Sequence, residues 1–552
     1  MNRFVCGRAD GWTRRAMVKT MGIAGLAAPG IAGSLGGAWA QSTLPFPAED
    51  ARAKPGGVLR IGMPVAPMVD PALTADPILG NQFRPVVETL SLIGPDNIAR
   101  EMLATGWKAS SDLTTWDLTL REGVFWHNGE ELIADHIAWN IRRWFDREAS
   151  PGGPTGLNTI AALSEDRDGK TILSPGAVEV TGPYELRLRL REPVLSVMED
   201  LARPATAICH PSFRPPFSAN TLGTGPFSLE EITPGEACIL ERVDVMATGD
   251  PFRYWGEPVY LDEIHFYDPS SLFESGPDAA VEAYGAGDVD VIAAVQANQF
   301  EAVRGLEADI STVGTATTFA CRMNVNEPPF TSRRVREAIV RSIDNAAVKN
   351  RVLGEIGEVG ANQLVAPVQP DSSGSVPPSR DLDEARELLA EEGFPNGLFI
   401  TLDVRADASR QERVICEAIR DQVAEAGIRL TLRAMPSAEF DASARTAPFA
   451  ARRWQHRTLG AQTLLEAARP GGLIHETGFV DSDFDEALGQ ALATRDLRRR
   501  RTRLARAEKL LQDAFLFIQP LYFPVHMAAS ARLQGIGGHP DRQIPFHRTW
   551  IE

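Results

Sequence analysis

Cysteine is scarce in this 552-residue chain, which contains five, and no two of them form a C-x-x-C pair. That absence excludes a zinc ribbon and a thioredoxin-like redox site. Cys209, Cys238, Cys321 and Cys416 lie beyond the first forty residues. In an oxidising compartment these four thiols have three full pairings, between which the sequence does not choose. Buried, unpaired cysteines are the expectation for at least some of them.

Positive charge and long apolar runs are also lacking. Lysine and arginine number 56 against 73 aspartates and glutamates, a formal net charge of -17, so a nucleic-acid backbone is not the expected partner. After residue 40 no stretch is long and apolar enough to span a bilayer. With 43% hydrophobic and 23% charged residues, the chain has an ordinary globular composition. Its length predicts about three structural units.

Catalytic motifs are missing as well. The segment Asp168–Thr171 ends like a phosphate-binding loop, but Ser164 occupies the place of the first glycine. The segment His475–Phe479 begins like a zinc-protease helix without its second histidine, and no G-x-S-x-G elbow occurs. We therefore expect no enzyme activity, no cofactor and no protein-bound metal.

The N-terminus has the order of an export signal. Arg14 and Arg15 precede a mildly apolar stretch from Met21 to Leu35, and Ala38-Trp39-Ala40 supplies small residues at the cleavage positions. The paired arginines resemble a twin-arginine signal. No cysteine follows that stretch directly, so no lipid anchor is expected. The sequence predicts a signal peptide over residues 1–40 and a soluble, periplasmic mature chain.

Strands and helices alternate along the rest of the chain. Apolar alternation predicts strands over residues 58–63, 115–120, 184–190 and 428–432. Helical spacing predicts helices over 134–145, 383–392 and 413–426, and one or two more over 483–516. This alternation indicates the α/β class.

A series of short patterns follows one order through the mature chain. They are Gly56–Gly62 with Val69-Asp70-Pro71, Val87–Leu90, Met102–Trp107, Asp112–Gly129, Thr224–Phe227, Tyr254–Gly256, Gly287–Asp290, Met323-Asn324, Pro329-Phe330, Arg334–Ile339, Ile343-Asp344 and Ala385–Gly393. Together they resemble family 5 of the bacterial extracellular solute-binding proteins, which serve ABC importers of peptides and nickel chelates.

The resemblance implies a two-lobed α/β fold of the periplasmic-binding-protein type (type II), with an extra subdomain in the first lobe and a hinge between the lobes. The expected limits are 41–88, 222–318 and 523–552 for the first lobe, 89–221 for the subdomain and 319–522 for the second lobe. The chain is expected to cross between lobes near residues 318–324 and 520–525. The implied function is capture of a peptide or similar small solute by lobe closure, for delivery by a monomer to an ABC permease with its ATPase subunits. A metal-chelate carrier, or a hydrolase or chaperone on this scaffold, remains the alternative.

Peptide binders of the family have a W-x-A-D-Y-like segment whose aspartate holds the peptide amine. Here Trp454 is retained, Gln455 follows it, and Arg457 stands where the aspartate is expected. A guanidinium repels an ammonium group and favours a carboxylate or phosphate, so the resemblance with this departure predicts an anionic solute. The further candidates for ligand contact are Arg203 and Arg453, His475 near the histidine of the nickel branch, and Met63 and Met68 in the loop after the first strand.

Overall fold

The computed structural model describes residues 52–552 except 75, 147–152, 155, 257, 274–277, 444 and 473. The expected signal peptide, residues 1–40, lies outside the described residues. In the part of the chain that is described, no helix has both the length and the apolar character needed to cross a membrane.

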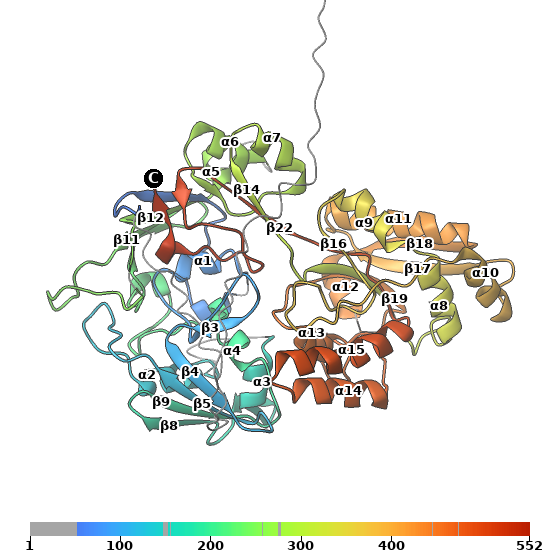
Figure 1. The fold of residues 1–552 in the computed structure, drawn as a ribbon, viewed down its shortest axis with the longest axis horizontal. Helices are drawn as coiled ribbons and strands as arrows, with labels where there is room; N and C mark the ends of the chain where they lie inside the picture. Colours follow the sequence, from blue (N-terminus) through green and yellow to red (C-terminus); the bar gives the residue numbers. More distant parts are fainter. Residues whose placement is uncertain are drawn as a thin grey trace, which may run out of the picture. The chain divides into compact units, whose positions relative to one another are not determined.

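The first lobe is built on a seven-stranded mixed sheet (Figure 1). Its order is β10 (Phe227–Thr233), β11 (Ala237–Arg242), β12 (Glu263–Tyr267), β1 (Val58–Gly62), β13 (Val291–Ile292), β22 (Val525–Ala529) and β14 (Asp309–Val313). Strand β1 is parallel to both β12 and β13. Helices α6 (Ala279–Ala286) and α7 (Phe300–Arg304) pack on β13 and β22 through Val281 and Val303.

An extra subdomain interrupts the first lobe. It has an antiparallel sheet in the order β4 (Ala104–Ala109), β5 (Thr115–Leu120), β9 (Glu185–Arg189) and β8 (Val178–Gly182). Helix α2 (Ala134–Arg143) covers this sheet, because its apolar stripe, with Ile137 and Ile141, shares one core with Leu186 and Leu188 of β9. Trp126 is fully buried in that core.

The second lobe has its own sheet, in the order β16 (Glu358–Val359), β21 (Leu521–Tyr522), β15 (Thr318–Met323), β19 (Phe449–Trp454), β17 (Leu398–Arg405) and β18 (Ile428–Met435), with β20 (Phe517–Ile518) also pairing β15. One face packs against α8 (Arg333–Arg341), α9 (Asn345–Leu353), α10 (Leu382–Glu391) and α11 (Arg410–Glu425). The other face packs against α13 (Gly460–Ala467), α14 (Ser482–Leu492) and α15 (Leu497–Asp513) (Figure 1).

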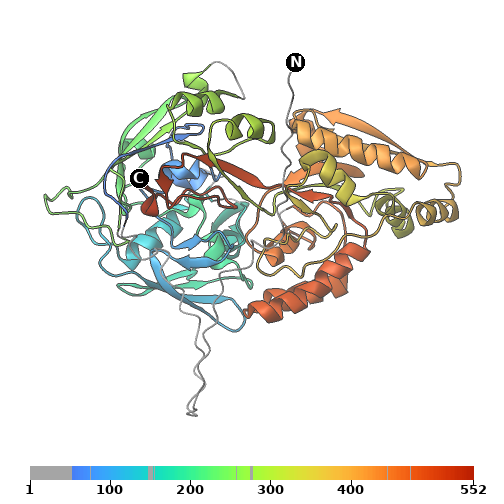
Figure 2. The same ribbon diagram turned by 45° about the horizontal axis from the view of Figure 1, so that its top comes forward.

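The chain connects the two sheets twice. Residues 314–317 lead from β14 to β15, and residues 523–524 lead back from β21 to β22. The connections are hydrogen-bonded to each other, since the Thr315 hydroxyl donates to the Phe523 carbonyl (2.6 Å) and the Phe523 amide donates to the Thr317 carbonyl (2.8 Å). After the return, the red C-terminal segment ends inside the first lobe (Figure 2). Two adjacent short connections form a hinge.

The predicted α/β class is confirmed, and the predicted elements are present with small shifts at their ends. Helix α11 begins at Arg410, three residues before the predicted start, because Ser409 and Glu412 form a capping box there. The stretch 483–516 is two helices, α14 and α15, the second capped by Asp496. The four cysteines are all free and buried.

Candidate functional site

The two lobes meet at a hydrogen-bonded surface that we call the lobe junction. The first lobe contributes Asn97, Asp200 and Arg203, and the second contributes His456 and Gln462. His456 Nε2 lies 2.9 Å from Asn97 Oδ1, and Gln462 Nε2 donates to Asp200 Oδ1 (3.0 Å). Arg203 Nη2 donates to the His456 carbonyl (3.3 Å). These contacts place the segment after β19 directly against the first lobe.

His456 is a neutral imidazole at this junction. The Ala316 amide donates to its Nδ1 (3.0 Å), so the proton is on Nε2 and is donated to Asn97. Burial lowers the pKa of His456 to about 4, with Asp541 raising it and Arg203 lowering it further. The side chain therefore joins the lobes as a fixed donor and acceptor at neutral pH.

A small cavity of about 20 Å³ lies beside this segment, and three of the predicted residues line it together: Trp454, Gln455 and Arg457. Trp454 is buried, with its ring edge-on to Phe517, and its indole Nε1 has no hydrogen-bond partner among the described residues. Gln455 is exposed. A buried donor without an acceptor is costly, so Trp454 Nε1 is suited to a polar ligand atom.

The predicted arginines do not form a free positive cluster in this conformation. Arg457 pairs with the buried Glu466 (2.7 Å), Arg203 with Asp541 (2.8 Å) and Arg453 with Glu412 (2.7 Å). Arg452 likewise contacts Glu476. Each guanidinium already faces a carboxylate, so the group as a whole is close to neutral.

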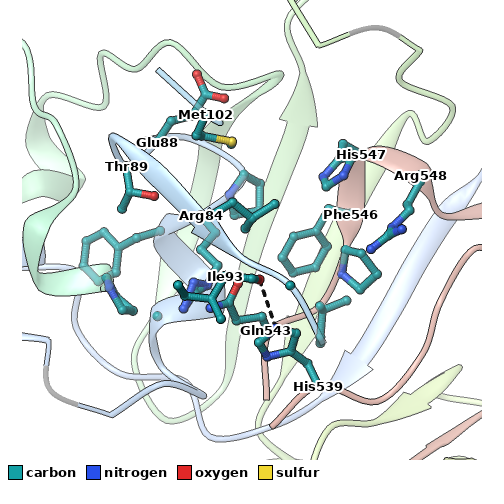
Figure 3. A pocket seen from close by; sticks show the side chains of 18 of the residues that line it. Arg84, Glu88, Thr89, Ile93, Met102, His539, Gln543, Phe546, His547 and Arg548 are labelled. Atoms are coloured by element: carbon teal, nitrogen blue, oxygen red, sulfur yellow. Dashed lines mark hydrogen bonds between the residues drawn. The ribbon is translucent and has the colours of Figure 1, made fainter. Parts of the chain in front are cut away.

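A much larger cavity, of about 670 Å³, lies within the first lobe (Figure 3). We call it the first-lobe cavity. Segment 80–102 forms one side of it and segment 535–548 forms the other. Four further residues complete the wall: Pro204, Ala207, Pro226 and Tyr254. Its size is that of cavities that enclose small ligands. No local pattern pointed to it, because its walls come from opposite ends of the chain.

The first-lobe cavity has a buried carboxyl group in its wall, that of Glu88. It accepts hydrogen bonds from the Thr224 hydroxyl (2.7 Å), the Tyr254 hydroxyl (2.8 Å) and the Trp255 indole (3.0 Å). Burial raises the pKa of Glu88 to about 7, although these hydrogen bonds act in the opposite direction. Both carboxylate oxygens of Glu88 therefore already accept hydrogen bonds from residues of the first lobe.

A model of the bacterial extracellular solute-binding proteins, family 5 (its middle region), matches residues 99–472. The chain belongs to this family. The dipeptide-binding protein DppE of Bacillus subtilis is 23% identical over 85% of this chain and 87% of its own length. The glutathione-binding protein GsiB of Salmonella paratyphi A is 24% identical over 62% of each chain. The structure of HbpA2 from Haemophilus parasuis matches with a TM-score of 0.76 at 19% identity, over 90% of this chain and 100% of that one.

These matches confirm the two-lobed periplasmic-binding-protein fold for this family 5 protein. The structure places the other predicted ligand residues, Met63, Met68 and His475, outside the walls of both cavities. Met63 and Met68 are buried in the first-lobe core, with Met68 Sδ 3.9 Å from Cys238 Sγ, and they line neither cavity. His475 is half-buried, and its Nε2 is without a hydrogen-bond partner within the described ranges. Those ranges contain no cluster of three or more His, Cys, Asp or Glu side chains placed to hold a metal ion.

Proposed function

We propose that this protein is the periplasmic binding component of an ABC importer, and that it captures a peptide or similar small solute between its lobes. On this proposal it delivers the solute unchanged, as a monomer, to a membrane permease driven by ATPase subunits. The supporting observation is that two separate sheets, joined by a two-stranded hinge, meet through His456 and Asn97. The dipeptide and glutathione proteins among the relatives support the solute class.

The solute is proposed to bind at the small cavity beside the lobe junction. Because that cavity is only about 20 Å³, the lobes must separate to admit a peptide. The Arg457–Glu466 pair then offers one group to a carboxylate and one to an ammonium. This neutral pair fits a zwitterion better than the anion expected from Arg457 alone.

We expect a true solute to stabilise the protein and to be recovered unchanged. At one hundred times Kd, binding to the closed form alone adds about 2.7 kcal/mol to the free energy of unfolding. A panel of dipeptides, tripeptides and glutathione is to be screened by thermal unfolding, with small-angle scattering to detect lobe closure. Trp454→Ala should remove the thermal shift, whereas Phe399→Ala, which alters a ring 69% exposed on the same lobe, should not. Recovery of a chemically altered solute would overturn the proposal.

A metal-chelate carrier of the same fold is the second candidate. It is favoured by the Nε2 of His475, which has no hydrogen-bond partner in the part of the chain that the structure describes. Burial lowers the pKa of His475, so its imidazole is neutral and able to ligate near pH 7. Nickel–histidine in the same panel separates the candidates, because a chelate carrier should respond to it and lose that response in His475→Gln.

Export through the twin-arginine route is proposed from residues 14 and 15. Arg14→Lys with Arg15→Lys should leave the full-length precursor in the cytoplasm, because the receptor reads the arginine pair. Immunoblots of periplasmic and cytoplasmic fractions check this. The matched control is Arg3→Lys with Arg8→Lys, which keeps the pair and should export normally. Normal periplasmic yield of the first variant contradicts the proposal.

A further inference from the structure

The first-lobe cavity contains an arginine with two guanidinium nitrogens that lack a hydrogen-bond partner among the described residues. Arg84 follows helix α1 (Gly80–Phe83), and its Nε and Nη2 atoms are buried without any hydrogen bond in the described part of the chain. The acid that acts on it most, Asp541, is already bonded to Arg203. Arg548 lies in the opposite wall, and its buried Nε also has no hydrogen-bond partner among the described residues (Figure 3). The third arginine, Arg100, pairs with Asp96 (2.7 Å).

Arg84 keeps its positive charge despite this burial. Burial lowers the pKa of Arg84 to about 10, which still leaves the guanidinium protonated at neutral pH. Folded proteins rarely leave a buried charge without a counter-charge, because desolvation is expensive. The cavity's own carboxyl, Glu88, is held by Thr224, Tyr254 and Trp255, and no ion pair joins it to Arg84. Asp541 is the acid whose charge reaches Arg84, but its carboxylate is hydrogen-bonded to Arg203, so the unpaired donors of Arg84 are left for an anion from outside the chain.

The rest of the wall is mainly apolar. Phe83, Leu92, Ile93, Met102, Ile544 and Phe546 surround the space. A fully charged metabolite such as a sugar phosphate would leave its polar atoms unpaired against these side chains. An elongated apolar body with one anionic head matches both the wall and the two unpaired donors of Arg84.

We propose that the first-lobe cavity binds an amphipathic monocarboxylate, with its carboxylate on Arg84 and its apolar body among Phe83, Ile93 and Phe546. The guanidinium fork can hold a carboxylate through two parallel hydrogen bonds. All residues that line the cavity belong to the first lobe, so this site is separate from the lobe junction and does not depend on the proposed peptide site.

Decanoate is the probe for this site. The mature protein is unfolded in guanidinium chloride, dialysed and refolded to remove any bound molecule, and decanoate and methyl decanoate are titrated by calorimetry. Decanoate should bind at one site per chain. Arg84→Met should weaken decanoate about tenfold or more, a loss of about one charge-assisted hydrogen bond. It should leave the uncharged ester unchanged, and Arg84→Lys should fall between, because an ammonium lacks the fork.

Two controls separate a binding role from a structural one. Arg142→Met removes an exposed guanidinium from the same lobe and should bind decanoate normally. Without ligand, Arg84→Met should unfold at a higher temperature than the wild type, because a buried charge with two unpaired donors is gone. The proposal is overturned if decanoate does not bind the wild type, if Arg84→Met binds it equally well, or if Trp454→Ala at the lobe junction abolishes the binding.

Discussion

Asp541→Asn should lower the free energy of unfolding by about 3–5 kcal/mol, because it removes one member of a buried ion pair and leaves the other charged. Asp541 is 3% exposed and accepts a hydrogen bond from Arg203 Nη1 (2.8 Å). Burial alone would raise the pKa of Asp541, but Arg203 together with His456 and His539 outweighs burial and holds the pKa well below the usual range. Asparagine keeps the shape of the side chain but supplies no charge to Arg203 or the nearby Arg84.

Urea unfolding followed by tryptophan fluorescence measures this loss at pH 7. A carboxyl with a lowered pKa contributes stability above the unfolded value of about 4 and loses it as the pH falls further. The difference between wild type and Asp541→Asn should therefore shrink in acid. Asp421→Asn is the matched control, since its pair with Arg351 (2.9 Å) is nearly half exposed on both sides and should cost less than about 1 kcal/mol. Equal losses in the two variants would contradict the prediction.

The patterns that identified the family are those that build its turns. A Cβ at Gly225 would lie 2.3 Å from the Pro85 carbonyl oxygen, so the Thr224–Phe227 turn requires glycine there. Asp70 of the Val69–Pro71 pattern caps the next turn and pairs with the buried Arg143 (2.7 Å). Asp290 of the Gly287–Asp290 pattern binds Arg60 of β1. Because such residues fix the backbone, the fold was predictable from them, and for the same reason they do not name a solute.

The candidate site was only partly predictable. Trp454, Gln455 and Arg457 do lie together, since they are neighbours in one segment at the end of β19. The carboxylate partners of the arginines were not predictable, because Glu412 and Glu476 come from other elements that only the folded chain brings near. The burial of Met63 could have been predicted from the sequence. Met63 continues the alternation of Leu59 and Ile61, and all three side chains are buried.

The pH dependence of stability should change when His456 is replaced. An unfolded histidine has a pKa of about 6.5, while burial lowers the pKa of the folded His456 to about 4. As the pH falls from about 6.5 to 4, this histidine binds a proton in the unfolded chain but stays neutral in the folded chain. The stability that His456 contributes is therefore complete above pH 6.5 and falls by about 3 kcal/mol by pH 4.

His456→Gln removes this titration but keeps a polar group between the lobes. The stability advantage of the wild type over His456→Gln, measured by urea unfolding, should therefore fall by about 3 kcal/mol from pH 7 to pH 4. Taking this difference cancels the opposite slope of Glu88 and Glu199, in which burial raises the pKa to about 7.

His526→Gln is the control: burial also lowers the pKa of His526 to about 4, but its partner Thr312 lies in the same lobe. Both variants should flatten the pH dependence. Only His456→Gln should enlarge the radius of gyration at pH 7, because the side chain of His456, unlike that of His526, is hydrogen-bonded to the other lobe. An unchanged radius in His456→Gln would mean that this hydrogen bond does not hold the lobes together.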